Sequence, residues 1–377
     1  MAQSTARPGI PNLSGRILTV NGPIDPATAG PTLMHEHIFI DFKAPSTASG
    51  EGVVLPQDRS ARGPEPKQPQ DSTPRRWARG VPGWARLDNY DESLAEIMEF
   101  KRAGGGTIVD VTNFGLTRNP EWLKRISNAS GLHVVMGAGW YQKALHPGDM
   151  TERTVAELTD IIVRDITQGA QGTGIRSGII GEIGVQGRPL TANEIKSIRA
   201  SARASRLTGA PMSFHMGGGT PEEKQRTMDI VVEEGVDLNH VVMGHNGSGD
   251  VEAMKRITDR GAYIEFDYIG DAPQEPDNGA SLRLMAERRA QQMKALIDVG
   301  LTDRILVAHD VCTQSQLKKN EGGGFAFTST LLIPALRNLG VTDDIIRRIM
   351  IDNPRRVLTF VAPQPPLAHQ TRSELAR

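Results

Sequence analysis

The chain has 377 residues, and its 43 lysine and arginine residues against 44 aspartate and glutamate residues give a formal net charge of -1. This balance gives no electrostatic reason to expect a nucleic acid or a membrane surface as partner, so we expect a small-molecule substrate. The first residues lack the apolar core of a signal sequence, and no run reaches about 18 apolar residues, so we expect a cytoplasmic protein.

The first ordered elements are predicted in residues 16–41. An Asn-Gly pair between two apolar segments predicts a short hairpin over residues 16–24. The apolar run 31–41 then predicts the first core strand. Because side chains alternate in a strand, His35 and His37 share one face and can bind one metal ion together, whereas Glu36 points the other way.

Residues 43–88 form a long insertion after this strand, rich in Pro, Gly, Arg, Ser and Gln and without periodicity. Its two tryptophans, Trp77 and Trp84, favour a lid that docks on the rest of the protein. A flexible surface loop stays open as the alternative. The tail 362–377 is proline-rich and then polar, so we expect it at the periphery.

From residue 90 onward, helical patterns alternate with short apolar runs. We expect a helix over 90–102, helices after the capping boxes Thr191–Glu194 and Thr220–Glu223, and a final helix over 343–350. The further strands are expected within 104–112, 132–139, 177–184, 210–215, 239–245, 261–267 and 304–310. Eight strands with intervening helices predict one α/β domain over 1–377, a (β/α)8 TIM barrel. A doubly wound open sheet is the runner-up, but the Gly-x-Gly-x-x-Gly turn is missing.

In such a barrel the catalytic groups follow the C-terminal ends of the strands. Four histidines and two carboxylates stand there: His35, His37, Glu182, His215, His245 and Asp310. One histidine at a strand end is more often structural, so the whole set carries the argument. It is typical of two divalent metal ions that share a carboxylate, with zinc favoured and manganese, cobalt or iron as replacements.

The other candidate residues have simpler interpretations. His133, His146 and His240 lie at strand starts or in loops, so we interpret them as structural or exposed. Cys312 is the single cysteine, and it can form neither an internal disulfide nor a zinc site by itself. We expect a small buried thiol there rather than a nucleophile.

With these residues the chain resembles the phosphotriesterase family of the amidohydrolase superfamily over about residues 17–360. The motifs that carry the resemblance are His35-Glu-His37, Gly181-Glu-Ile-Gly184, Ser-Phe-His215-Met-Gly, Gly244-His245, Glu-Phe-Asp267, His309-Asp310 and the Asp-Asn-Pro-Arg-Arg-Val-Leu run from Asp352. The resemblance implies a binuclear site, with His35, His37 and Asp310 at the more buried ion. It implies His215 and His245 at the exposed ion, and Asp310 as the catalytic base.

Two positions depart from the organophosphate-hydrolysing members. Those members bridge their metals with a carboxylated lysine, whereas residues 179–184 contain no lysine and Glu182 takes the place, as in the homology-protein branch. Tyr268 stands where that subgroup has a histidine. The resemblance also places Tyr141 toward the substrate, and we take Tyr141 and Tyr268 as substrate-binding candidates.

The primary hypothesis is therefore a metal-dependent hydrolase in which a metal-bridging hydroxide attacks a lactone, ester or amide. Asp310 then transfers the proton to the leaving group. Organophosphate triester hydrolysis is one alternative, and a non-catalytic binding protein on the barrel scaffold is another. A homodimer also stays open.

Overall fold

The computed structural model describes residues 9–42, 84–216, 219–246, 250–267, 269–271 and 277–368. Most of the expected lid lies outside these ranges. Trp77 and Tyr268 also lie outside them, whereas Trp84 lies within them. No helix in the described part of the chain is both long and apolar enough to cross a membrane.

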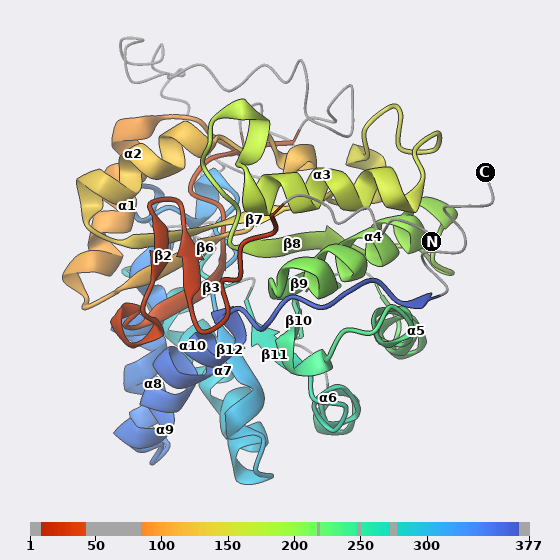
Figure 1. Ribbon diagram of the computed structural model, residues 1–377. Helices are drawn as coiled ribbons and strands as arrows, with labels where there is room; N and C mark the ends of the chain where they lie inside the picture. Colours follow the sequence, from red (N-terminus) through yellow and green to blue (C-terminus); the bar gives the residue numbers. More distant parts are fainter. Residues whose placement is uncertain are drawn as a thin grey trace, which may run out of the picture.

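Eight parallel strands form the centre of the fold, with helices around them (Figure 1). In sheet order they are β3 (Thr32–Glu36), β6 (Thr107–Asp110), β7 (His133–Ala138), β8 (Ile179–Gly184), β9 (Met212–His215), β10 (Val241–Met243), β11 (Tyr263–Phe266) and β12 (Ile305–Val307). The end of β3 is bound to the segment after β12: Asp310 N donates to His35 O at 3.0 Å, and His37 N donates to Val311 O at 3.2 Å. The predicted (β/α)8 barrel is confirmed.

The helices surround the strands in chain order. They are α1 (Tyr90–Arg102), α2 (Pro120–Ser130), α3 (Val155–Thr167), α4 (Ala192–Thr208), α5 (Pro221–Glu233), α6 (Val251–Thr258), α7 (Ala280–Asp298), α8 (Ile333–Asn338), α9 (Asp343–Arg347) and α10 (Asn353–Leu358). The helix expected over 90–102 is α1, which has the expected bounds. The final helix begins at Asp343 as expected but continues as a π-helical turn, Arg348–Asp352, into α10. Pro354 lacks the amide hydrogen that a regular helix would use there.

Reciprocal capping bonds explain where three helices begin. The boxes expected at Thr191 and Thr220 form before α4 and α5. A third, between Thr154 and Glu157, begins α3. In each box the threonine hydroxyl and the glutamate carboxylate bind amide hydrogens that have no partner within the helix.

The predicted N-terminal hairpin consists of β1 (Ile17–Thr19) and β2 (Gly22–Ile24). It packs at the start of two barrel strands, since Val20 N donates to Val134 O at 2.9 Å. At the neighbouring strand a Cβ on Gly178 would lie 1.9 Å from Leu18 O. Only glycine allows this close approach of the two backbones.

A second ladder joins the two ends of the insertion. β4 (Ile40–Asp41) pairs antiparallel with β5 (Arg86–Leu87). The returning chain is also bound to the loop after β12, because Gln314 N donates to Trp84 O at 2.9 Å and Gln314 Nε2 to Arg86 O at 2.8 Å. Both ends of the insertion are therefore attached to the barrel.

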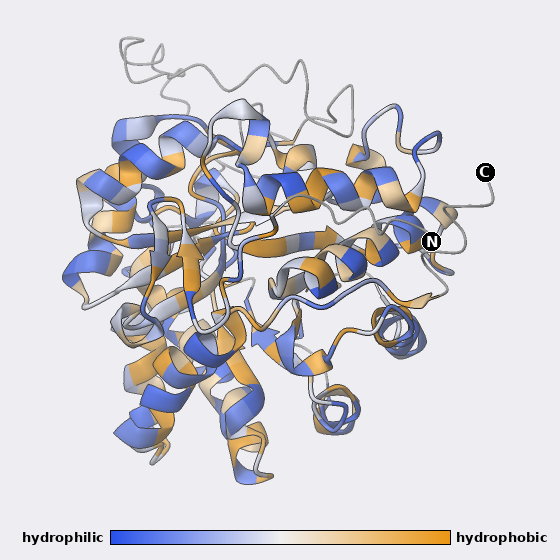
Figure 2. Cartoon of the chain, viewed as in Figure 1, coloured by the Kyte–Doolittle hydropathy of each residue, from blue (hydrophilic) through white to orange (hydrophobic). Residues whose placement is uncertain are grey.

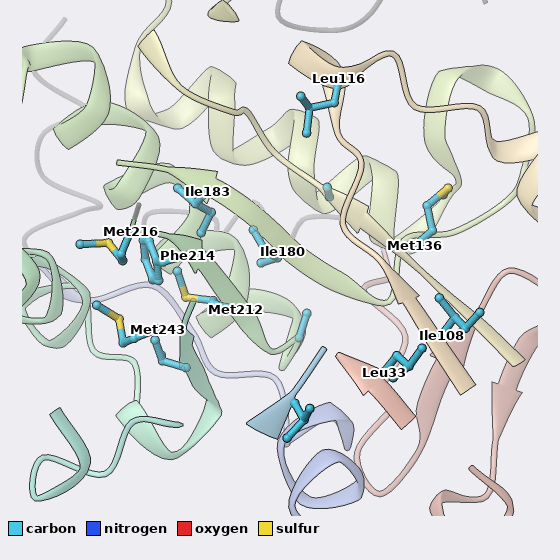
Figure 3. Packing of buried hydrophobic residues seen from close by; sticks show 14 of the residues in the cluster. Leu33, Ile108, Leu116, Met136, Ile180, Ile183, Met212, Phe214, Met216 and Met243 are labelled. Atoms are coloured by element: carbon cyan, nitrogen blue, oxygen red, sulfur yellow. The ribbon is translucent and has the colours of Figure 1, made fainter. Parts of the chain in front are cut away.

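The apolar residues form two clusters, one inside the barrel and one between the barrel and its helices. Met34, Val109 and Val135 belong to the inner cluster, whereas Leu33 and Ile108 belong to the outer one. Figure 3 shows Leu33 and Ile108 side by side on their neighbouring strands. The central strands are coloured mainly as hydrophobic in Figure 2, and the helices also carry hydrophilic residues.

The Gly178 contact predicts a steric cost. Gly178→Ala is expected to lower the free energy of unfolding by about 1–3 kcal/mol or more, because the new Cβ meets backbone that cannot rotate away. Urea denaturation measures this change. Gly219→Ala is the control, since its nearest atom is the flexible Met216 Cε at 3.1 Å. Equal unfolding midpoints for the two variants would contradict the packing of the hairpin.

Candidate metal centre

The structure brings the six side chains singled out in the sequence to one end of the barrel. They lie in the last half of β3, β8 and β9 or just after β3, β10 and β12. Five are at least nine-tenths buried, and His215 is the most exposed, with 13% of its side chain accessible. The six residues at this end of the barrel are His35, His37, Glu182, His215, His245 and Asp310.

Two β-bulges aim three of these side chains into the barrel. In β3 the register against β6 shifts between Leu33 and Glu36, and in β8 the register against β9 shifts between Ile180 and Ile183. Each shift inserts an extra residue and reverses the alternation of faces. Met34, an inner-core residue, is consequently followed directly by the inward-facing His35.

Glu182 lies at the centre of the cluster and is 1% exposed. Its Oε1 lies 3.2 Å from His37 Nε2. Its Oε2 lies 2.7 Å from His215 Nδ1 and 3.1 Å from His35 Nε2. The two carboxylate oxygens thus contact histidines from both halves of the expected site.

Asp310 and His245 complete the arrangement. Asp310 Oδ1 lies 3.3 Å from His37 Nε2 and 3.8 Å from His35 Nε2. His245 Nε2 lies 2.7 Å from His215 Nδ1 and 3.8 Å from Glu182 Oε2. Both Asp310 and His245 have a positive φ of 56°, a conformation that costs energy for residues other than glycine.

These residues fit divalent metal ions. Two groups of possible ligands share Glu182: His35 and His37 with Glu182, and His215 and His245 with Glu182. Tetrahedral zinc with nitrogen and oxygen ligands at about 2.0–2.1 Å places neighbouring ligand atoms about 3.3 Å apart, close to the spacing around His37. The buried Nε2 of His35 makes no hydrogen bond to another described residue. A lone pair left in this way suits a metal ligand.

A second layer of polar side chains holds the histidine rings. Glu265 Oε2 lies 2.9 Å from His35 Nδ1, and Thr112 Oγ1 lies 2.9 Å from His37 Nδ1. Asp267 Oδ1 lies 2.8 Å from His245 Nδ1, and Asp267 Oδ2 accepts from His245 N at 3.0 Å. Such partners fix the orientation of a ligand ring and leave its other nitrogen for the metal.

Glu265 and Thr112 are not among the site residues that the sequence predicts. The signal for Glu265 was present, because it lies two residues before Asp267 and a carboxylate inside a buried strand needs a partner. Thr112 carries no such signal, since threonine is ordinary in strands.

Close packing of buried charged groups shifts several pKa values in the cluster. Burial lowers the pKa of His245, but the charge and hydrogen bond of Asp267, with Glu182 and Asp310, outweigh it and raise the pKa to about 10. In the same way burial is outweighed at His37 by Asp310 and Glu182, and its pKa rises to about 9. Burial raises the pKa of Glu265 to about 7, against the opposing charge of His35.

The remaining candidates are placed as follows. Tyr141 is 8% exposed, and its hydroxyl lies 3.4 Å from His215 Nδ1. His146 Nε2 lies 3.0 Å from Tyr141 O, and Cys312 is partly buried with a pKa raised above its ordinary value by burial. His133 and His240 belong to none of the possible ligand groups among the described residues.

Comparison with known proteins places this geometry in context. The model of the phosphotriesterase family matches residues 15–358. The N-acetyltaurine hydrolase of Homo sapiens is 32% identical, covering 93% of this chain and 99% of the relative. The phosphotriesterase-related protein of Nematostella vectensis is 36% identical, and the match covers 92% of this chain and 99% of the relative. Among solved structures, a resiniferatoxin-binding protein from Rhodobacter sphaeroides has 36% identity and a TM-score of 0.77, covering 92% and 96%.

The second layer predicts an effect on metal affinity. Glu265→Gln is expected to weaken metal binding about 10- to 100-fold, because His35 loses the partner that fixes its ring. Competition with a chelator measures the affinity. Glu234→Gln is the control, since Glu234 is equally buried but pairs with Arg199 and Arg203. Equal affinities in both variants would refute an orienting role.

The pKa values predict a pH dependence of the metal-free protein. His37 and His245 titrate at about 9 and about 10 in the folded state, against 6.5 in the unfolded chain. The folded state then binds more protons, so this stabilisation should be complete below about pH 6.5 and should be lost as pH rises through about 9 to about 10. Zinc-loaded protein should not show this loss, because its bound histidines carry no proton. Melting temperatures with chelator and with zinc test this, and parallel curves would contradict it.

Proposed function

Because the chain belongs to the phosphotriesterase family, we propose that this hydrolase binds two divalent metal ions in its histidine and carboxylate cluster and cleaves a carbonyl bond. An N-acyl amide is the first candidate substrate, ahead of lactones and esters. Zinc is the proposed metal, with manganese, cobalt or iron as replacements.

The position of Glu182 carries the proposal. This buried carboxylate contacts His37 through one oxygen and His215 through the other, which is the arrangement needed to join two ions. When bound, the ions would polarise the substrate oxygen and lower the pKa of a water molecule. The donor set contains nitrogen and oxygen only, which suits zinc.

Asp310 is the proposed catalytic base. Its carboxylate lies against His37 at the end of β12 and is 5% exposed, so water competes little for it. It accepts the proton of the attacking water and passes it to the leaving group. Tyr141, next to His215, is a proposed substrate contact at the rim, and Tyr268 stays a second one.

Two observations favour a carbonyl substrate over a phosphotriester. The family resemblance implies that organophosphate-hydrolysing members bridge their metals with a carboxylated lysine. In this chain Glu182 stands at that position. Relatives at about one-third identity over nearly the whole chain are named N-acetyltaurine hydrolase, and that name describes cleavage of an N-acyl amide. We propose the same bond type here, with a small acidic amine as leaving group.

A binding protein is the second candidate, because a relative of 36% identity is named for binding resiniferatoxin. Five of the six predicted ligands, all except Asp310, belong to possible metal-binding groups, and this weighs against a role limited to binding. Buried carboxylates and histidines are costly to retain without a function that uses them. Cytoplasmic location and a homodimer stay predictions.

A substrate panel tests the proposal. Protein stripped of metal and reloaded with zinc is assayed on N-acetyltaurine, a lactone, an aryl acetate and an aryl phosphotriester. We expect turnover of the amide, loss with chelator, and a fall in kcat of about 100-fold or more for Asp310→Asn. Turnover of the phosphotriester alone would favour the organophosphate alternative.

Metal analysis separates the binding protein from the enzyme. The proposal requires about two equivalents of tightly bound metal, reduced in Glu182→Ala. A metal-free protein that turns over no panel substrate would leave the binding role standing.

A further inference from the structure

Glu36 is a buried carboxylate that faces away from the metal cluster. It ends β3 between His35 and His37 and is 0% exposed. A buried carboxylate is costly unless hydrogen bonds satisfy its oxygens. Its partners therefore indicate what it does.

These partners lie on both sides of the proposed catalytic base. Glu36 Oε1 accepts from His309 N at 2.8 Å, and Oε2 accepts from Val311 N at 3.0 Å. The residue between them is Asp310, whose own amide donates to His35 O at 3.0 Å. Three successive amides beyond β12 are thus bound to the end of β3.

The side chain of His309 extends this contact. Thr328 N donates to His309 Nε2 at 3.0 Å, so this nitrogen carries no hydrogen and Nδ1 carries one. Nδ1 lies 2.9 Å from Glu36 Oε1, a close contact that lacks hydrogen-bond geometry. His309 is fully buried, and it therefore packs between Glu36 and the segment around Thr328.

The contact helps to hold Asp310 in a strained backbone conformation. Asp310 has a φ of 56°, which a residue other than glycine adopts only when its surroundings impose it. Glu36 binds the amide of the 310–311 peptide, which follows Asp310, and the amide of the 308–309 peptide one residue earlier. The 309–310 peptide between them is held by the bond from Asp310 N to His35 O. The Asp310 side chain is thereby directed at His37, 3.3 Å away.

We propose that Glu36 is a positioning residue that holds Asp310 in its productive orientation. The proposal rests on the proposed function, in which Asp310 is the base. It assigns to the middle residue of His35-Glu-His37 a role on the opposite face from the metal ligands.

Glu36→Gln tests the proposal. The variant keeps the shape but replaces one acceptor oxygen with a donor, so one of the two amides loses its partner. We expect kcat on the amide substrate to fall about 10- to 100-fold, with KM within about twofold and two metal equivalents retained. Hydrogen exchange of the amide that loses its acceptor, His309 or Val311, should become at least about tenfold faster in the metal-free protein.

Glu96→Gln is the matched control. Glu96 is also buried, and its carboxylate accepts from two consecutive amides, Lys318 N and Lys319 N, at 2.9 Å each. It should lower stability to a similar degree but leave kcat unchanged. An equal fall of kcat in both variants, or an unchanged kcat in Glu36→Gln, would overturn the proposal.

Wild-type protein decides the case if Glu36→Gln does not fold. The His309 and Val311 amides should then be among the slowest to exchange in the loops that follow the barrel strands. Fast exchange of these amides would refute the proposed role of Glu36. This measurement needs no turnover, so it also separates a failure of the positioning role from a failure of the proposed function.

Discussion

The barrel mouth depends on how one buried carboxylate, Glu182, is held among histidines. A charge in this position is stable only when its partners approach from several directions, and here they come from β3 and β9. The strands must therefore be held in one register to within a fraction of an ångström. The bulges in β3 and β8 meet this requirement, because they turn His35 and Glu182 inward at the level where the strands end.

Local signals in the sequence predicted a large part of the fold. The bounds of α1 and the starts of α4 and α5 follow from apolar spacing and capping boxes, which act within a few residues. The six candidate ligands were found because each stands at the end of an apolar run, and parallel strands must end together in a barrel. Their roles as metal ligands are our proposal.

What sequence reasoning missed depends on pairing between distant segments. A strict alternation gives Glu36 the outward face but does not say that residues 309 and 311 meet it there. The two register shifts are likewise properties of strand pairs, invisible in either strand alone. The end of the final helix was misjudged for a local reason, the effect of Pro354 on the preceding turn.

The short ladder between β4 and β5 has a consequence for how such a protein changes over time. Register pairs Ile40 with Leu87 and Asp41 with Arg86, so the chain leaves and re-enters the barrel at the same place. The entropy of closing a loop grows only logarithmically, by about 0.6 kcal/mol for each doubling of its length. Insertions and deletions between these anchors are thus nearly neutral for the barrel. Selection can remodel this segment rapidly while the proposed metal ligands remain under tight constraint.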